Sequence, residues 1–358
     1  MPLTLIDTPE ALASYLNSKP PGQVPPVCAI DTEADSLHRY RESLCLIQFA
    51  ADDDCFLIDP LAIRDLSALA AFLPRAVVWM HGADYDMTML KRQFGELPAT
   101  VYDTQIGARL LGARRFGLAD LVLHYFGVEL SKSSQKADWG KRPLTPKMVE
   151  YALNDVRYLL PMADKIVADL LAKGRLSWFE ESCHSARKKV LERDDAKDDL
   201  WRIKGAGKFD PYSLACLRAL WRWRDKEADS WDRPSFMVAT NQQLLEWSSA
   251  LAQHQDVVLP RHFRPDRVKN FRQMLEALKS LPESQWPARP KLHRRKHDRD
   301  FERKVEELLK SRDHLAAELD LECSLLASRA AIESIAAGEA DPHQVLLNWQ
   351  MNVLGFNR

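Results

Sequence analysis

The sequence predicts an α/β domain with a mixed sheet flanked by helices, followed by all-α modules. Two observations predict this fold class. Short apolar runs typical of strands come first, and helical patterns are interleaved with them later, between residues 27 and 172. This order is typical of an α/β domain with a mixed sheet. From about residue 176 onward the sequence has no convincing strand pattern and shows only helical ones.

The predicted strands lie near the N-terminus, and each is marked by a short apolar run. Three aspartates at 52–54 separate the second run from the third and predict a hairpin turn. A helical stretch near 66–72 precedes the fourth run. The four strands are expected at 27–30, 44–50, 56–58 and 76–80. Further helices are expected at about 84–94, 104–112, 118–126 and 146–172.

The C-terminal half is expected to contain a connecting helix and two small helical units. The connecting helix is predicted at 178–191, and the glycines of 204–207 break the pattern after it. The first helical unit begins near Leu214. Three prolines within 281–290 cannot lie inside a helix and therefore indicate a linker. A basic run at 291–299 follows, and the second helical unit begins near Phe301.

Length and composition indicate a globular protein of two or three domains, with 358 residues, 46% of them hydrophobic and 28% charged. We expect no membrane contact and no secretory signal, because the sequence has neither an apolar run of spanning length nor a basic, then apolar, N-terminus. None of the six cysteines forms a Cys-x-x-Cys pair, which favours buried thiols in a reducing cytoplasm. The net charge of −1 gives no overall sign of a nucleic-acid partner, although the local charge distribution matters more.

Acidic residues follow the predicted strands and line one predicted helix. Asp31 and Glu33 are alternate residues at the end of the first strand, so their side chains share a face. Two carboxylates so close repel each other, and a cation would keep both ionised. Tyr151 and Asp155 are four residues apart on a helix and also share a face. Asp86 lies just past a strand, near the start of a helix. Such oxygen ligands favour Mg²⁺ or Mn²⁺ over zinc.

Together these residues predict hydrolysis of a phosphodiester by two metal ions, with in-line attack of a metal-activated water. We expect Asp31 to bridge both ions, Glu33 and Asp155 to complete one ion's shell, and Asp86 to help hold the second. Tyr151 is expected to position the water, because a phenol with a pKa of about 10 is a poor base at neutral pH. Each acidic pair alone is weak evidence, since an acidic residue after a strand is often a helix N-cap. The three acidic motifs together, in this order along the chain, are much more specific evidence for such a site.

Several stretches resemble the DEDD exonuclease superfamily in its tyrosine form, DEDDy. Residues 29–33 with 43–49 resemble its first motif, 81–86 its second and 151–155 its third. Two further stretches are similar to ribonuclease D and its exosome-associated relatives, and they lie at 102–105 and 134–144. Two segments resemble an HRDC module, a small helical nucleic-acid-binding domain, and they lie at 209–224 and 233–238. The segment from about 301 resembles a second, more divergent copy.

The resemblance implies a ribonuclease H-like exonuclease fold and a domain order. The domains expected are an exonuclease domain at 1–175, a connecting helix and linker at 176–205, an HRDC domain at 206–282, a linker at 283–298 and a divergent HRDC-like domain at 299–358.

The same resemblance implies an activity: a 3′→5′ exoribonuclease that releases 5′-mononucleotides, using two divalent cations, Mg²⁺ or Mn²⁺. Its substrates would be tRNA precursors, small structured RNAs and single-stranded 3′ ends, and we expect a cytoplasmic monomer. Carried over by position, the catalytic set is Asp31, Glu33, Asp86, Tyr151 and Asp155, with the four carboxylates as metal ligands.

Two further aspartates compete with this set. Asp84 also lies in the second motif, but Asp86 is preferred because it follows the aromatic Tyr85, as the aspartate of the motif does. Asp35 adds a third carboxylate beside Asp31 and Glu33 and shares their face if the strand continues. We expect Asp35 to lie off the metal site.

Substrate contacts are expected from cations near the first and third motifs. His38 and Arg41 lie in a predicted loop, where they would contact phosphates, although a solvated loop is an equally good interpretation. Lys136 and Arg142 add positive charge before the third motif and suit a phosphate backbone. Trp139 would stack on a base, although a role as a core anchor is as good an interpretation.

Two other functions remain open. A DNA 3′→5′ exonuclease would use the same chemistry, and HRDC modules also occur in DNA helicases, but the sequence has no P-loop motif. A non-catalytic RNA-binding scaffold would be indicated by loss of a metal ligand, and no ligand of the set is lost.

Overall fold

The computed structural model describes residues 5–18, 25–131, 133–193, 200–289 and 299–357. Their contacts divide the chain into two units. The first unit comprises the described residues of Met1–Ala34, Leu44–Arg193 and Lys296–Arg358. The second comprises those of Asp35–Ser43 and Asp194–Arg295. Most of the predicted linker and its basic run falls at 290–298, outside the described residues. The predicted domain boundaries stay predictions.

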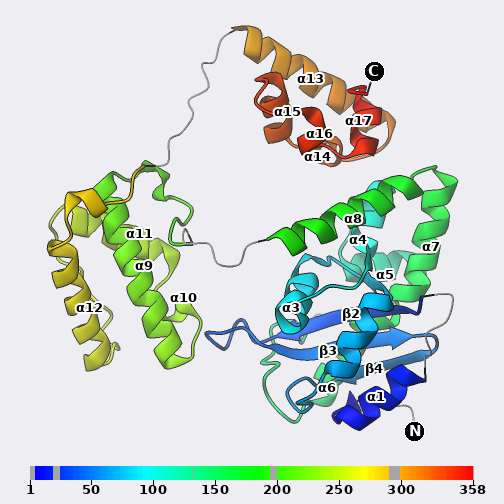
Figure 1. Ribbon diagram of the computed structural model, residues 1–358, viewed down its shortest axis with the longest axis horizontal. Coiled ribbons are helices and arrows are strands. Elements are labelled where there is room, and N and C mark those ends of the chain that lie inside the picture. The colour runs from blue at the N-terminus through cyan, green and yellow to red at the C-terminus, as the bar shows by residue number, and fades with distance from the viewer. Residues whose placement is uncertain (1–4, 19–24, 132, 194–199, 290–298, 358) are drawn as a thin grey trace. The chain divides into compact units, whose positions relative to one another are not determined.

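A six-stranded mixed sheet, in the order β1-β4-β3-β2-β5-β6, forms the centre of the first unit (Figure 1). β2 pairs antiparallel with β3 and parallel with β5, so it has both kinds of strand pairing, one on each side. The strands are β1 Leu5–Ile6, β2 Val27–Ala34, β3 Leu44–Ala51, β4 Asp54–Ile58, β5 Val77–Met80 and β6 Thr100–Asp103. The α/β class with a mixed sheet is confirmed. The short strands β1 and β6 were not predicted.

Helices flank this sheet, and Figure 1 shows them around the strands. They are α1 Pro9–Asn17, α2 Ser67–Phe72, the 3-10 helix η1 Leu73–Arg75, α3 Asp84–Phe94, α4 Thr104–Leu110, α5 Leu118–Phe126, α6 Pro146–Arg157, α7 Leu159–Ala172 and α8 Leu176–Glu192. The single helix predicted over 146–172 is therefore two helices, which meet at Tyr158 (φ −99°, ψ −5°). The cause is Pro161, because its ring would clash with the carbonyl of Arg157 in a continuous helix.

The alternation of side chains along β2 assigns its residues to two faces. Cys28 and Ile30 pack in a core with residues of α1, α2 and α3. Ala29 packs on the opposite face with residues of α6 and α7. Because side chains alternate along a strand, Asp31 and Glu33 share the face of Ala29, and Thr32 shares the face of Ile30.

The second unit is helical around an aromatic core. Trp223 packs there against Trp247, Phe263 and Phe271. Its helices are η2 Ala206–Lys208, α9 Pro211–Trp231, α10 Ser235–Val238, α11 Asn241–Ala252, α12 Pro265–Lys279 and η3 Glu283–Gln285. No strand occurs in the described residues after 176, as predicted.

The C-terminal helices belong to the first unit and pack on α8. The Trp178 ring stacks on Trp349 with centroids 4.8 Å apart. The Glu181 carboxylate accepts hydrogen bonds from the backbone N–H groups of Asn348 (2.7 Å) and Trp349 (3.1 Å). These helices are α13 Arg299–Glu318, α14 Cys323–Leu326, α15 Arg329–Ala336, α16 Pro342–Val345 and α17 Asn348–Leu354. Across the described residues, none of the helices has both the length and the apolar character needed to cross a membrane.

Candidate active site

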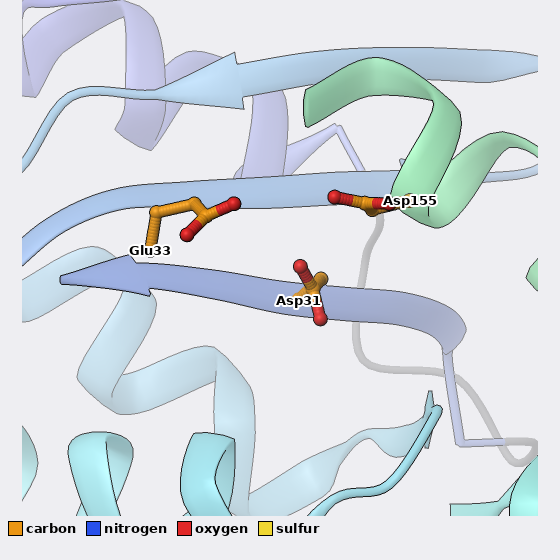
Figure 2. Close-up of side chains that lie close together, drawn as sticks. All are labelled: Asp31, Glu33 and Asp155. Atoms are coloured by element: carbon orange, nitrogen blue, oxygen red, sulfur yellow. The ribbon is translucent and has the colours of Figure 1, made fainter. Parts of the chain in front are cut away.

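Three carboxylates converge where β2 passes α6. Asp31 and Glu33 project from β2, and Asp155 projects toward them from α6 (Figure 2). One oxygen of each carboxylate lies within 4.8 Å of an oxygen of the other two. The alternation along the strand, predicted from the sequence, therefore brings the first two side chains to the helix that carries the third.

An N-cap residue and a buried apolar face fix the position of α6. Thr145 is the N-cap, and its hydroxyl accepts a hydrogen bond from the backbone N–H of Met148 (3.3 Å). The buried residues Met148, Ala152 and Leu153 pack against Leu46 and Leu57 of the sheet. With this face buried, Tyr151 and Asp155 remain on a partly exposed edge of the helix, beside β2.

The three carboxylates are close enough to oppose one another's ionisation. Burial, together with the charges of Asp86, Asp155 and Glu33, holds the pKa of Asp31 well above its ordinary value. Burial and the charges of Asp155 and Asp86 raise the pKa of Glu33 to about 9. Burial and Asp86 raise the pKa of Asp155 to about 7, against the lowering effect of the Tyr151 hydroxyl. This cluster of carboxylates needs a cation to stay fully ionised at neutral pH.

Asp86 lies near this cluster but is held by the opposite face of β2. Its side chain is 5% exposed. Its Oδ1 accepts hydrogen bonds from the Thr32 hydroxyl (2.6 Å) and the Thr32 backbone N–H (3.0 Å). Burial raises the pKa of Asp86 to about 6, although both bonds from Thr32 lower it. Asp86 is not one of the three residues whose oxygens lie within 4.8 Å of one another, yet its charge acts on all three.

The two competing aspartates lie elsewhere. Asp84 is exposed and binds Arg193 through both carboxylate oxygens, at 2.6 Å and 3.1 Å. Asp35 follows the end of β2, where the pairing with β3 shifts register between Glu33 and Ala34. Its carboxylate accepts a hydrogen bond from the backbone N–H of Ser43 (2.7 Å). This geometry favours Asp86 over Asp84 for the second motif and gives Asp35 a role in the loop.

Tyr151 lies beside Asp155 and donates a side-chain hydrogen bond to it. Burial, Asp155, Glu33 and Asp31 raise the pKa of the Tyr151 phenol above its ordinary value. Its ring centroid lies 6.0 Å from that of Trp139. Tyr151 is therefore a protonated hydrogen-bond donor at neutral pH.

The donor set fits a hard divalent cation. The converging ligand atoms are all carboxylate oxygens, which Mg²⁺ and Mn²⁺ prefer. The raised pKa values of Glu33 and Asp155 show that their ionised forms are disfavoured without a cation, and a bound cation would stabilise those forms.

Comparisons with known proteins identify the family of this chain. A family described as 3′-5′ exonuclease matches residues 3–171, and the HRDC domain family matches residues 213–259. Ribonuclease D of Pseudomonas paraeruginosa is 30% identical over 271 residues, which cover 72% of this chain and 72% of that relative. The chain belongs to the ribonuclease D family. The resemblance based on the motifs is thus confirmed.

Other members of the ribonuclease D family extend the comparison. Ribonuclease D of Escherichia coli is 36% identical over 252 residues, which cover 69% of this chain and 65% of that relative. This match spans just under two thirds of the relative's length. The crystal structure of Escherichia coli ribonuclease D, described as an exoribonuclease involved in structured RNA processing, superposes with a TM-score of 0.76 at 28% identity. The superposition covers 100% of this chain and 97% of that one.

The three residues expected to contact substrate near the third motif lie in different environments. Lys136 is exposed. Trp139 is 1% exposed and packs in the core beneath α6. The Arg142 guanidinium binds both carboxylate oxygens of Asp59, at 2.6 Å and 2.7 Å, and donates to the carbonyl of Cys45 (2.7 Å). Trp139 and Arg142 therefore have structural roles in this conformation.

His38 and Arg41 lie in the second unit. The His38 carbonyl accepts a hydrogen bond from Arg233 (3.1 Å), and the Arg41 side chain lies 3.6 Å from Asp229. Phosphate binding by His38 and Arg41 stays a prediction.

The sequence did not predict the roles of two residues that support the site. Thr32 lies between Asp31 and Glu33, and only the fold shows that it binds Asp86. Asp103 accepts hydrogen bonds from the backbone N–H groups of Gly82 (2.9 Å) and Ala83 (3.0 Å), and so holds the turn before α3. Gly82 has φ +68°, which a glycine adopts without strain. The stretch 102–105 was recognised as a family signature, but its structural role was not predicted.

Proposed function

We propose that this chain is a 3′→5′ exoribonuclease that removes 5′-mononucleotides from the 3′ ends of RNA. The observation that carries the proposal is the convergence of Asp31, Glu33 and Asp155, with Tyr151 bonded to Asp155, in a member of the ribonuclease D family. The substrates proposed are tRNA precursors and other small structured RNAs with single-stranded 3′ ends. The description of the Escherichia coli relative as a structured-RNA exoribonuclease supports this choice.

Four carboxylates would hold the two divalent cations of the proposed site, Mg²⁺ or Mn²⁺. Asp31, Glu33 and Asp155 would supply the converging oxygen ligands, and Asp86 would complete the set. Bound there, the cations would supply a water of lowered pKa and stabilise charge on the phosphate oxygens.

The remaining roles belong to side chains of the chain itself. Thr32 fixes the Asp86 carboxylate through two hydrogen bonds. Tyr151 keeps its proton, which it donates to Asp155, and its phenol oxygen would orient the attacking water by accepting a hydrogen bond from it. It does not act as the base, because its ordinary pKa is about 10 and its surroundings raise it further.

A gel assay with end-labelled RNA tests the proposal. With Mn²⁺ or Mg²⁺, we expect a 3′ label to be released at once as a mononucleotide and a 5′-labelled strand to shorten in single steps. Asp31→Asn should lower the rate at least about 100-fold, because several kcal/mol of charge stabilisation are lost. Asp84→Asn is the matched control and should act within about 2-fold of the wild type, because exposed ion pairs contribute little.

Three results would contradict parts of this proposal. Full activity of Asp31→Asn would refute the assigned site. Equal rates on matched DNA would favour the alternative DNA 3′→5′ exonuclease. RNA binding without shortening would favour the non-catalytic scaffold.

Location and assembly complete the proposal. We place the protein in the cytoplasm, which agrees with the six free cysteines of the structure. We propose a monomer, which light scattering of the purified protein would test.

A further inference from the structure

Gln48 lies in the middle of β3 and is paired directly with Asp31 in the antiparallel β2–β3 ladder. Directly paired residues of antiparallel strands project from the same face, with Cβ atoms roughly 5 Å apart. The Gln48 side chain is therefore a neighbour of Asp31 on the face where the three carboxylates converge. It is 0% exposed. Within the described part of the chain, neither its Nε2 nor its Oε1 has a hydrogen-bond partner.

The surroundings of Gln48 make this amide unfavourable for packing. On the same face, Leu46 and Leu57 are buried in an apolar core with Ala152 of α6. A buried amide without hydrogen bonds destabilises a fold by roughly 1–3 kcal/mol, whereas an apolar side chain of similar shape does not. If Gln48 only filled the core, an apolar residue would serve better.

We infer that Gln48 is a positioning residue for the metal centre, and this inference rests on the proposed function. Its Nε2–H group donates a hydrogen bond to the Asp31 carboxylate when that carboxylate holds a cation. The Gln48 amide is a buried neighbouring donor with no bond of its own. Ligating carboxylates are commonly hydrogen-bonded in this way, and loss of such a partner weakens metal binding about 10- to 100-fold.

The test compares Mn²⁺ affinity with stability in the absence of metal. Gln48→Met removes the amide and keeps the unbranched shape, and Gln48→Leu is a second variant in case one folds poorly. Leu57→Met is the matched control, because it changes a neighbouring buried side chain of the same face without removing a polar group. Calorimetry with Mn²⁺ alone gives the affinity, and thermal unfolding in EDTA gives the stability.

We expect the Gln48 variants to bind Mn²⁺ about 10- to 100-fold more weakly and to unfold in EDTA at the same or a higher temperature than the wild type. Leu57→Met should bind Mn²⁺ within about 2-fold of the wild type. Wild-type affinity in both Gln48 variants would overturn the inference and leave the proposed function standing. Weaker binding with an equal loss of stability in EDTA would also overturn it, since the role would then be structural. If the wild type itself bound no Mn²⁺, the proposed function would fail first.

Discussion

Replacing Thr32 by valine should show how strongly the fold holds Asp86. The Thr32 hydroxyl donates a 2.6 Å hydrogen bond to Asp86 Oδ1, and both side chains are buried. Valine keeps the shape and the strand preference of threonine but has no donor. The backbone N–H of residue 32, at 3.0 Å, would remain as a donor to Asp86 Oδ1.

The loss of stability expected for Thr32→Val depends on the charge of Asp86. Hydrogen bonds to charged groups contribute about 1.5–3 kcal/mol, and bonds between neutral groups contribute about 0.5–1.5 kcal/mol. The pKa of Asp86 is raised to about 6, so its carboxylate is ionised at pH 8 and protonated at pH 5. Thr32→Val should therefore lower the free energy of unfolding by about 1.5–3 kcal/mol at pH 8, and by roughly 1 kcal/mol less at pH 5.

Urea unfolding in EDTA at both pH values measures this difference. Thr32→Ser is the control: it keeps the hydroxyl and loses a methyl group, so its loss of stability should be the same at pH 8 and pH 5. If Thr32→Val were as stable as the wild type at pH 8, the hydroxyl would not hold Asp86 and the assignment of Asp86 to the site would lose its structural support.

Three further predictions concern the same unit. In EDTA, the free energy of unfolding should fall as the pH rises from about 5 to 9, because Glu33 and Asp155, with pKa values of about 9 and 7, keep protons in the folded chain that the unfolded chain has lost. The slope is up to about 1.4 kcal/mol per pH unit for each proton, Mn²⁺ should flatten it, and a flat profile in EDTA would contradict the raised pKa values. Tyr151→Phe should lower kcat on RNA about 10- to 100-fold while calorimetry finds Mn²⁺ affinity near that of the wild type; an unchanged kcat would exclude the positioning role. Glu181→Ala should lower the free energy of unfolding by about 1 kcal/mol, since it removes the acceptor at the start of α17; urea unfolding should show a smaller loss for the exposed control Glu192→Ala.

Part of this site could be predicted because it depends on local periodicity. Asp31 and Glu33 share a face by strand alternation, and Tyr151 and Asp155 share one by helical spacing. The sequence alone does not show which face of the sheet α6 covers, because that depends on the order of strands far apart in the chain.

The roles of single residues were also hard to predict where their partners are distant in the sequence. Arg142 was expected to bind phosphate because its charge was visible and its partner Asp59, 83 residues away, was not. The strand β1 was missed because a strand of two residues shows no alternation. The break between α6 and α7 could have been found, because Pro161 is visible in the sequence.

The packing of the C-terminal helices on α8 has a consequence for synthesis of the protein on the ribosome. The first unit is discontinuous: Trp178 is made early, and its stacking partner Trp349 follows the whole second unit. At a translation rate of roughly 5–20 residues per second, about ten seconds or more separate the two tryptophans. During that time the apolar surface of α8 lacks its cover, so chaperone binding to nascent chains should be strongest in this interval and should end when α17 emerges.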